Sequence, residues 1–517
     1  QDLDVSIPSF TEDLPTDSTE FPFIKSLDLD QDVSSRIARQ LHDVIKGNDQ
    51  VYTTPLIKRF SPEYILSQVD DLIERNKDKI NGPLLDLEMS NRSKFGPRSI
   101  AKPWKDRILD LNSYYENADR SSNVSTWNYS KSKGRFRPLS ADKALDLLKN
   151  STNSGLPFYT RKSIIKRKLI SEFNYLKYRK DPCLLFTRTQ ESKKTRNVWG
   201  YPAIDTLIEM CYYSVLLAHQ RKLSWRSAIT TPENVDTSVT KILDYAINNS
   251  LSLVSIDFSS YDASISVSLI IKAFEYIKSL FQQTYHDTID LLCKRMYTIP
   301  ILTPSGVFKG NHGVPSGSTF TNEVDSIVQY LIAKSSELVE ESMIQIQGDD
   351  GLYAMSDKDV DDFLSHFESE GLVVNRDKTI VSKSHCLYLQ KLFHPDYRDK
   401  YGVVHGVYPI YRALNRLIYQ ERWSKFEEFG LSGSDYYSIR AISILENVKY
   451  HPLFEDFVKL IYKLDKYSLG YTKEGVNKFV KMNFDSKGTS EIFKHQYGDD
   501  IKGINGFSTV KILKRLA

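Results

Sequence analysis

Residues 343–355 read MIQIQGDDGLYAM, two short runs of alternating apolar and polar residues on either side of a Gly-Asp-Asp-Gly core. Alternation with a period of two is typical of a half-buried β-strand, and a Gly/Asp core between two such runs is typical of a hairpin turn. We therefore expect a β-hairpin with Asp349 and Asp350 at its tip. Because two aspartates in a turn are often no more than turn chemistry, their meaning depends on what else the chain supplies.

A second acidic segment lies upstream. Residues 251–256 (LSLVSI) are apolar at alternate places and partly β-branched, which predicts a buried strand. The strand leads into DFSSYD, which places Asp257 at its end and Asp262 five positions later. Mg²⁺ prefers oxygen ligands, and two such ions about 3.5–4 Å apart drive in-line phosphoryl transfer. Aspartates at the ends of two strands, Asp257 and Asp349, can clamp such a pair of ions.

Between the two acidic segments lies GVPSGSTFTN, residues 313–322, a polar loop that runs into a helix. Phe320, Val324, Ile327 and Leu331 recur at helical spacing, so one face of that helix should pack on a core. The helix N-terminus offers backbone N–H groups to a phosphate, and hydroxyl and amide side chains in the loop can bond a sugar. Taken alone, the segment could equally be an ordinary capped helix.

Residues 161–196 are strongly basic. They hold twelve Lys or Arg against Glu172, Asp181 and Glu191, a local excess of nine. Phe173, Tyr175, Tyr178 and Phe186 interleave with these charges, which fits a groove that follows a nucleic-acid backbone and stacks bases. A solvated helix face with core aromatics is the alternative.

Composition sets the outer limits. The chain has 517 residues, 40% hydrophobic and 26% charged, with a formal net charge of only +3, as expected for a multi-lobed globular protein. Four isolated cysteines argue against a zinc site or a disulfide framework and favour a reducing compartment. No apolar run reaches the ~18–20 residues of a membrane span, and no signal peptide is evident, so we expect a soluble, unsecreted protein.

The ends and the middle of the chain carry weaker signals. The first thirty residues hold eight acidic groups against Lys25, with three prolines, and predict an extended arm that either wraps the body or stays solvated. Residues 61–250 read as mainly helical. The last stretch, from Ser486 to Ala517, is consistent with lining an exit, plugging a cleft or packing on a helical lobe.

In this order and spacing, the segments resemble the palm motifs of viral RNA-dependent RNA polymerases. Asp257-x4-Asp262 resembles motif A, Ser316-Gly317-x3-Thr321 motif B, and Gly348-Asp349-Asp350 motif C. The basic run Lys193-Lys194-Thr195-Arg196 is similar to motif F, and residues 152–157 to motif G. A helix after Ser356 followed by Lys378 resembles motif D, and residues 387–393 with Lys391 resemble motif E. The resemblance covers roughly residues 150–395 and looks most like the enzymes of picobirnavirus or partitivirus type, small segmented double-stranded RNA viruses.

The resemblance implies an α+β right-hand fold with fingers, a ferredoxin-like palm of antiparallel strands and helices, and a helical thumb. The expected divisions are 1–60 for the N-terminal arm, 61–204 and 294–312 for the fingers, 205–293 and 313–395 for the palm, and 396–517 for the thumb and C-terminal tail. The implied partners are template and product RNA, nucleoside triphosphates and a viral capsid protein, with no membrane. The implied location is the virion interior or the host-cell cytoplasm.

The resemblance also assigns roles to residues. Two Mg²⁺ or Mn²⁺ ions would be bound by Asp257 and Asp349 with help from Asp350, and Lys378 would protonate the leaving pyrophosphate. The residues implied to bind the nucleotide are Lys193, Lys194, Arg196, Asp262, Ser316, Thr321 and Asn322. The residues implied to contact template or product RNA are Ser154, Gly155, Pro157, Gly317 and Lys391.

One position departs from the family pattern. Nine residues after its Ser, motif B often has an Asn that helps recognise the ribose, and this chain has Asp325 there, with Asn322 directly after Thr321. The partner of Asp262 in ribose recognition is therefore open.

Two rival interpretations remain. A reverse transcriptase shares the metal-binding acids but uses a bulky side chain to exclude the 2′-OH. The acid at Asp262, and Gly348 before the Asp pair, disfavour the reverse transcriptase interpretation. A virion protein that only packages RNA would bind RNA regardless of Asp349.

Overall fold

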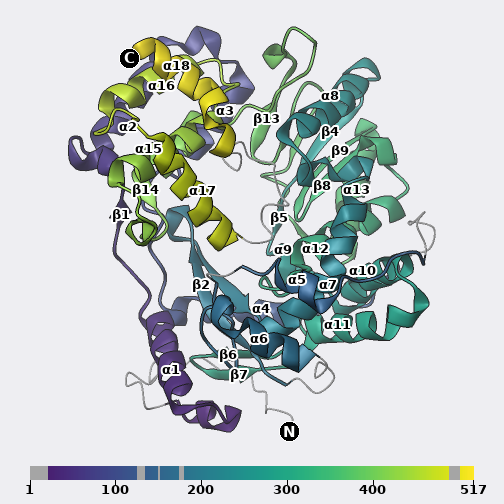
Figure 1. Cartoon of the computed structure of the whole chain (residues 1–517). Coiled ribbons are helices and arrows are strands. Elements are labelled where there is room, and N and C mark those ends of the chain that lie inside the picture. Colours follow the sequence, from purple (N-terminus) through teal and green to yellow (C-terminus); the bar gives the residue numbers. More distant parts are fainter. Residues whose placement is uncertain (1–20, 125–133, 150–151, 174–179, 488–500) are drawn as a thin grey trace.

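The computed structural model describes residues 21–124, 134–149, 152–173, 180–487 and 501–517. Its elements form three regions: a lobe with a central sheet, a region around a second sheet, and a helical lobe that contains the C-terminus (Figure 1). Among the described residues, no helix is both long and apolar enough to span a membrane.

The central sheet has four antiparallel strands in the order β11-β4-β9-β8. Their bounds are β4 (Ser252–Ile256), β8 (Ile344–Gln347), β9 (Asp350–Met355) and β11 (Ile380–Ser382). Along the chain, helices separate the first strand from the second and the third from the fourth, which gives the βαββαβ topology of a ferredoxin-like sheet. The expected hairpin of residues 343–355 is confirmed as β8 and β9, and the expected strand of residues 251–256 is confirmed as β4, which pairs with β9.

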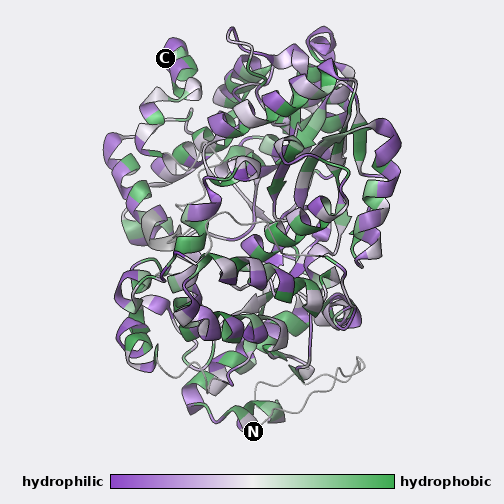
Figure 2. Ribbon diagram, turned by 90° about the vertical axis from the view of Figure 1, so that its right-hand side faces the viewer, coloured by the Kyte–Doolittle hydropathy of each residue, from purple (hydrophilic) through white to green (hydrophobic). Residues whose placement is uncertain are grey.

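Helices cover this sheet and fill the core beside it. They are α7 (Ala203–Gln220), α8 (Pro232–Asn248), α9 (Tyr261–Ser264), α10 (Val267–Leu280), α11 (His286–Thr298), α12 (Thr321–Ser335) and α13 (Val360–Ser369). The strands of the central sheet are mostly hydrophobic in Figure 2, as befits a sheet at the centre of the largest hydrophobic cluster. Val324, Ile327 and Leu331 of α12 are buried in that cluster, which confirms the helical spacing seen in the sequence.

A second sheet has the order β3-β2-β6-β7. Its strands are β2 (Cys183–Thr189), β3 (Thr195–Gly200), β6 (Ile301–Thr303) and β7 (Gly306–Phe308). The expectation of a mainly helical chain over residues 61–250 is therefore wrong for the β2–β3 hairpin. The hairpin is stabilised by parallel pairing of β2 with β6, more than a hundred residues away, and no local periodicity reports such a contact.

Helix α4 (Ile108–Glu116) packs beside this sheet, whereas α5 (Ala141–Leu145) and α6 (Lys162–Glu172) pack on α7 and contribute to the largest hydrophobic cluster. Residues 22–27, within the first thirty residues that were expected to be extended, form η1 (Pro22–Leu27), and α1 (Gln31–Lys46) follows; both pack on the second sheet. The Arg36 guanidinium donates to the Tyr159 carbonyl at 2.6 Å, and the Gln40 amide donates to that of Leu185 at 3.2 Å. Residues 1–20 of the expected arm lie outside the described residues.

The helical lobe combines two helices from the N-terminal part of the chain with the helices of its C-terminal part. It contains α2 (Pro62–Arg75), α3 (Gly82–Arg92), α14 (Ile410–Ile418), α15 (Gly433–Glu446), α16 (Phe454–Leu464), α17 (Lys473–Lys487) and α18 (Ser508–Leu516). All contribute to one hydrophobic cluster, and β1 (Tyr52–Thr53) pairs with β14 (Tyr419–Gln420). The last helix packs on this lobe, where Glu446 accepts hydrogen bonds from the Ser508 and Thr509 N–H groups, each at 3.0 Å.

Short elements complete the chain. Strands β5 (Phe258–Ser259) and β10 (Val373–Val374) pair with each other, as do β12 (Cys386–Tyr388) and β13 (Lys391–Phe393). The remaining 3₁₀ helices are η2 (Pro55–Lys58), η3 (Lys77–Lys79), η4 (Trp104–Asp106), η6 (Glu191–Lys193), η7 (Ser224–Ile229), η8 (Gln283–Tyr285), η9 (Glu341–Met343), η10 (Asp357–Asp359), η11 (Pro395–Tyr397), η12 (Phe426–Phe429) and η15 (Ile501–Gly506).

Candidate active site

The strand register brings the two acidic segments together. Strands β4 and β9 are antiparallel neighbours, and their last pair is Ile256 opposite Gly351. Asp257 therefore leaves the end of β4 where Asp349 and Asp350 enter β9 from the hairpin turn. The carboxylates of Asp257 and Asp349 lie close enough for the charge of the first to raise the pKa of the second.

Helix α12 fixes the hairpin turn that carries Asp349. The Gly348 N–H donates to Ser326 Oγ at 2.8 Å, and the Gln329 amide donates to the Gly348 carbonyl at 2.8 Å. The Tyr353 hydroxyl in turn donates to Gln329 Oε1 at 2.7 Å. Gly348 has φ +60°, a left-handed conformation that glycine adopts without strain. The turn is thus held on both sides of its peptide by one helix.

The pKa values of Asp257, Asp349 and Asp350 are all raised above the ordinary value of an aspartate. Burial raises the pKa of Asp257, although Lys378, Lys194 and Lys94 oppose that rise. Burial also raises the pKa of Asp349, and the neighbouring charges of Asp262 and Asp257 add to it. Asp350 is the most enclosed: burial and the charge of Asp349 raise its pKa to about 7. Crowded carboxylates of this kind are typical of sites where a cation is expected to supply the missing positive charge.

Asp257 and Asp349 suit a divalent cation that is coordinated partly by the protein and partly by a nucleotide. The described residues contain no group of three or more His, Cys, Asp or Glu arranged as a metal cage. Mg²⁺ commonly binds only one or two carboxylates and completes its coordination shell with water and substrate phosphates. Asp257 and Asp349 can supply these carboxylates. Asp350 is directed elsewhere, because its Oδ2 accepts a hydrogen bond from the Leu389 N–H at 2.8 Å.

The loop before α12 is anchored on strand β3. Ser316 Oγ accepts from the Trp199 N–H and donates to the Asn197 carbonyl, both at 3.3 Å. A Cβ at Gly317 would lie 1.6 Å from the Trp199 carbonyl oxygen, so only glycine permits this approach. The Thr321 hydroxyl donates to the Pro315 carbonyl at 2.6 Å, which closes the loop on itself. Ser316, Gly317 and Thr321 therefore shape the loop through bonds within the protein.

Two further residues of α12 face the acidic segments. Asn322 lies against the hairpin turn, with its Oδ1 3.0 Å from the position that a Cβ on Gly348 would occupy. Burial raises the pKa of both Asp325 and Asp262, and the two side chains lie close enough for the charge of Asp262 to raise the pKa of Asp325 further. The residue at the position where motif B often has Asn thus lies beside the second acid of motif A.

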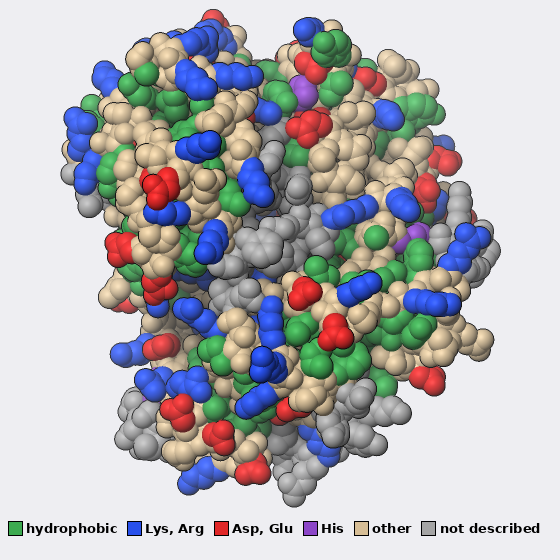
Figure 3. Space-filling model, viewed as in Figure 1, with side chains coloured by type: hydrophobic (Ala, Val, Ile, Leu, Met, Phe, Trp, Pro, Cys, Tyr) green, Lys and Arg blue, Asp and Glu red, His purple; other side chains and the backbone are tan. Residues whose placement is uncertain are grey.

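The β2–β3 hairpin and the segment after β10 supply cations. Arg196 lowers the pKa of both Asp262 and Asp349, and Lys194 lowers that of Asp257. Lys378 lowers the pKa of Asp257 more than any other charge, and the Asp257 N–H donates to Thr379 Oγ1 at 3.1 Å. Lys193 is exposed on the turn next to Lys194. Figure 3 shows Lys and Arg side chains along the hollow between the helical lobe and the rest of the molecule.

The residues expected to contact RNA are less uniform. Ser154 is fully buried, and its Oγ accepts from the Thr160 N–H at 3.1 Å, so its side chain shapes the loop and is not offered to a strand of RNA. Gly155 is buried as well, with φ +63° and no room for a Cβ beside the Tyr201 carbonyl. Pro157 is half-buried. Lys391 lies apart from the aspartates, near the charges of Asp236, Lys449 and Glu233. Residues 174–179 of the basic segment lie outside the described residues.

Sequence reasoning missed several residues that the structure brings to this site. Lys94 lowers the pKa of Asp257, and Glu209 accepts hydrogen bonds from Ser318 Oγ at 2.6 Å and the Thr319 N–H at 3.0 Å. The buried pair of Arg226 and Glu323, 2.6 Å apart, ties η7 to α12. None of these residues sits in a recognisable motif. Asp325 alone had a signal, its place nine residues after Ser316.

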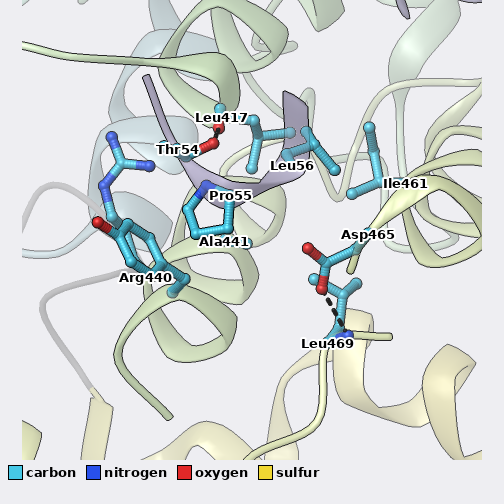
Figure 4. A pocket seen from close by; sticks show the side chains of 10 residues that line it. Thr54, Pro55, Leu56, Leu417, Arg440, Ala441, Ile461, Asp465 and Leu469 are labelled. Carbon is cyan, nitrogen blue, oxygen red and sulfur yellow. Dashed lines mark hydrogen bonds between the residues drawn. The ribbon is translucent and has the colours of Figure 1, made fainter. Parts of the chain in front are cut away.

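A small cavity lies elsewhere, among Thr54, Leu417, Arg440, Ile461 and Asp465 of the helical lobe (Figure 4). The Thr54 hydroxyl donates to the Leu417 carbonyl at 2.5 Å across its wall. No aspartate of the two acidic segments lines it, so it belongs to the packing of the helical lobe.

Comparisons with known proteins agree with this geometry. Residues 139–403 match the family model described as viral RNA-dependent RNA polymerase. A potential RNA-dependent RNA polymerase of human picobirnavirus is 30% identical over 461 residues, which are 83% of this chain and 85% of that protein. The chain belongs to the family of viral RNA-dependent RNA polymerases. An RNA-directed RNA polymerase of Cryptosporidium parvum virus 1 is 29% identical over 269 residues, 46% of this chain and 51% of that one.

Solved structures give the same result. The crystal structure of a human picobirnavirus RNA-dependent RNA polymerase matches with a TM-score of 0.77 at 27% identity, and covers 92% of this chain and 96% of that one. Its insertion-loop deletion mutant matches with a TM-score of 0.78 at 28% identity over the same shares. The right-hand fold of fingers, ferredoxin-like palm and helical thumb is thereby confirmed, as is the likeness to polymerases of picobirnavirus type.

The polymerase therefore synthesises RNA on a template from nucleoside triphosphates, and its family uses divalent metal ions. This family membership excludes the two rival interpretations, a reverse transcriptase and a protein that only packages RNA.

Proposed function

We propose that Asp257 and Asp349 hold two Mg²⁺ or Mn²⁺ ions for nucleotidyl transfer, with Asp350 in support. The register of β4 and β9 carries this proposal, because it places Asp257 at the same sheet end as the hairpin turn. Asp350 accepts a hydrogen bond from the Leu389 N–H, which anchors the turn to the β12–β13 hairpin, and its carboxylate adds negative charge beside Asp349. When bound, the ions would activate the primer 3′-OH and stabilise the pyrophosphate as it leaves.

The surrounding cations bind and orient the nucleotide. Lys194 and Arg196, with Lys193 beside them, neutralise the triphosphate, because their charges already reach the aspartates. The primer 3′-OH loses its proton to solvent as its oxygen bonds the α-phosphorus, the bond from that phosphorus to the oxygen bridging to the β-phosphate breaks, and Lys378 donates a proton to the departing pyrophosphate. Asp262 recognises the ribose, Asn322 lies close enough to the turn to assist, and Ser316 and Thr321 hold the loop beneath the base pair.

RNA contacts and subdomain limits follow the same scheme. Pro157 and the backbone around Ser154 and Gly155 guide the template, Gly317 lets the loop lie close to β3, and Lys391 holds the product strand near the thumb. The subdomains are the arm (1–60), fingers (61–204 and 294–312), palm (205–293 and 313–395) and thumb with tail (396–517). Pairing of β6, within 294–312, with β2 supports the split fingers, whereas α2 and α3, within the range 61–204, pack on the thumb helices.

By analogy with the picobirnavirus relatives, the enzyme works inside a virion or in the host-cell cytoplasm, in association with a capsid protein.

The test is incorporation of labelled nucleotides on single-stranded RNA with Mg²⁺ or Mn²⁺. Asp349→Asn and Asp257→Asn keep side-chain shape but remove a metal-binding charge, and each is expected to lower the rate by at least about a hundredfold. Asp362→Asn, an exposed acid on α13, is the matched control and should keep the rate of the unaltered chain. Full activity in Asp349→Asn would refute the assignment.

A further inference from the structure

His405 lies in the connecting segment of residues 394–409, which leads from β13 to α14, and both of its ring nitrogens contact carboxylates. Nδ1 lies 2.7 Å from Oδ2 of Asp236 on α8, and Nε2 lies 2.8 Å from Oδ2 of Asp399. The imidazole side chain is only 12% exposed. Its ring stacks on that of Tyr450, with the centroids 3.9 Å and the planes 6° apart. Because Tyr450 lies between α15 and α16, His405 joins α8 to the helical lobe.

These two hydrogen bonds require a doubly protonated ring. A neutral imidazole has a single N–H donor and an ionised carboxylate only accepts, so bonds at both nitrogens need the imidazolium. The remaining oxygens of both carboxylates already accept from the backbone: Asp236 Oδ1 from the Gly406 N–H at 3.1 Å, and Asp399 Oδ1 from the Val403 N–H at 3.0 Å. Backbone donors favour the ionised form of a carboxyl group. His405 is therefore assigned a positive charge.

The charge on His405 depends on pH. Burial lowers the pKa of His405, but the hydrogen bonds to Asp236 and Asp399 outweigh burial and raise that pKa above its ordinary value of 6.5. A raised pKa in the folded protein means that these contacts are complete at low pH and are lost as pH rises through that pKa. Once the ring has lost a proton, one carboxylate faces a nitrogen lone pair, and the contact between them becomes repulsive.

A neighbouring lysine can also titrate. Other charged groups on the elements packed against His405 are Glu233 and Asp244 of α8, Lys391 of β13, Arg398 of the connecting segment, and Lys449, which lies over the Tyr450 ring. Arg398 is paired with Asp244 at 2.5 Å. Burial lowers the pKa of Lys391, so only a variant of His405 separates the titration of the imidazole from that of this lysine.

The connecting segment transmits the position of His405 to the β12–β13 hairpin. The Leu392 N–H donates to the Val407 carbonyl at 3.0 Å, and the Val407 N–H donates to the Leu392 carbonyl at 2.8 Å. Val407 is two residues from His405, so β13 pairs with the backbone that the imidazolium holds. At the turn of the same hairpin, the Leu389 N–H donates to Asp350 Oδ2 at 2.8 Å. Hydrogen bonds therefore connect Asp350, through the β12–β13 hairpin, to the segment that carries His405.

We propose that His405, as an imidazolium held by Asp236 and Asp399, is a positioning residue that fixes the helical lobe against the β12–β13 hairpin and so helps to retain the product RNA. The proposal rests on the role proposed for Lys391 in holding that strand. When the ring proton is lost, the stacked Tyr450 and the lobe that carries it can shift relative to β13. Retention of RNA should therefore weaken as pH rises through the titration of His405.

The experiment measures the dissociation rate of a fluorescently labelled primer–template RNA duplex from the enzyme, without nucleotides, from about pH 6 to about pH 9, where an imidazole titrates. Since no chemistry occurs, the result does not depend on the metal-binding assignments. For the unaltered chain we expect the rate to rise about tenfold across this range. His405→Gln, which has no positive charge and no second ring nitrogen, should release RNA at the fast rate already at about pH 6. His366→Gln, on α13, is the matched control and should keep the rise with pH.

Three results would overturn the proposal. One is a dissociation rate of the unaltered chain that does not change with pH, and another is a rise of equal size in His405→Gln, which would place the titration at Lys391 or elsewhere. The third is a His405→Gln variant that is less stable to heat but, per folded enzyme, releases RNA as slowly as the unaltered chain, which would make His405 purely structural.

Lys391→Gln separates this failure from that of the proposed function. An unchanged dissociation rate in that variant would refute the role of Lys391 in holding the product strand. Faster release from Lys391→Gln, together with a pH-independent rate in the unaltered chain, would refute the role of His405 alone.

Discussion

Glu209 is a single buried residue on which the motif B loop depends. It lies in α7, 2% exposed, and accepts the hydrogen bonds from Ser318 and Thr319. Burial raises the pKa of Glu209 from its ordinary value of 4.5 to about 8, although those hydrogen bonds oppose the rise. The folded protein therefore holds a proton at Glu209 across a range in which the unfolded chain has released it.

The sign of the resulting stability change follows from proton linkage. Because the folded pKa is raised, the stabilisation is complete below about pH 4.5 and is lost as pH rises through about 8. Relative to Glu209→Gln, which cannot ionise, the unaltered chain should lose about 1.4 kcal/mol of unfolding free energy per pH unit in that window. Denaturant unfolding of both proteins at several pH values measures the difference, and a difference that does not change with pH would contradict the expectation.

At the scale of the element, α12 positions the hairpin turn as well as the loop before it. Gln329 is fully buried, and its replacement by Ala would leave the Gly348 carbonyl and the Tyr353 hydroxyl without their partner. We expect a loss of about 1–3 kcal/mol of stability and a fall in kcat of about tenfold to a hundredfold, because Asp349 is no longer held in place.

Steady-state kinetics at varied Mg²⁺ tests this role of Gln329. The metal concentration for half-maximal rate should rise, whereas the KM for nucleotide should stay within a few-fold, since the cations that hold the triphosphate are untouched. Lys334→Gln, on the last turn of the same helix, should behave as the unaltered chain. A fall in activity that only tracks the folded fraction would assign Gln329 a purely structural part.

The elements that sequence predicts here are those whose pattern is local. The 343–355 hairpin, the strand before Asp257 and helix α12 each show their own periodicity. The β2–β3 hairpin does not, since β6 stabilises it across the chain. Likewise the motifs predict Asp257 and Asp349, whereas the proximity of Asp262 and Asp325 and the support from Glu209 depend on packing between distant segments.

At the scale of the whole molecule, the N-terminal quarter of the described chain links fingers to thumb. Helix α1 packs on the second sheet, β1 pairs with β14, and α2 and α3 share the hydrophobic cluster of the C-terminal helices. A chain that begins on the fingers and then docks on the thumb closes the hand around the palm (Figure 1). Closure of this kind should help to retain RNA between successive additions of nucleotide.

Glu88 of α3 makes the most enclosed contact in this link. Its fully buried carboxylate accepts from the Ile410 and Tyr411 N–H groups, at 3.0 and 3.3 Å, and from His451 Nε2 at 2.8 Å. It therefore caps α14 from a helix more than three hundred residues away. His451 Nδ1 accepts from the Leu453 N–H, which assigns the ring proton to Nε2.

Replacing Glu88 with Ala would leave these buried donors without an acceptor. We expect a loss of about 3–5 kcal/mol of unfolding free energy, measured by denaturant, and a shift from template-length to short products, measured on a gel at a single enzyme encounter. Glu74→Ala is the matched control, because its ion pair with Lys77 is exposed and contributes little. Shorter products from Glu88→Ala at an unchanged rate per nucleotide would tie closure of the hand to retention of RNA. Template-length products at equal folded concentration would instead show that the link between α3 and α14 serves stability alone.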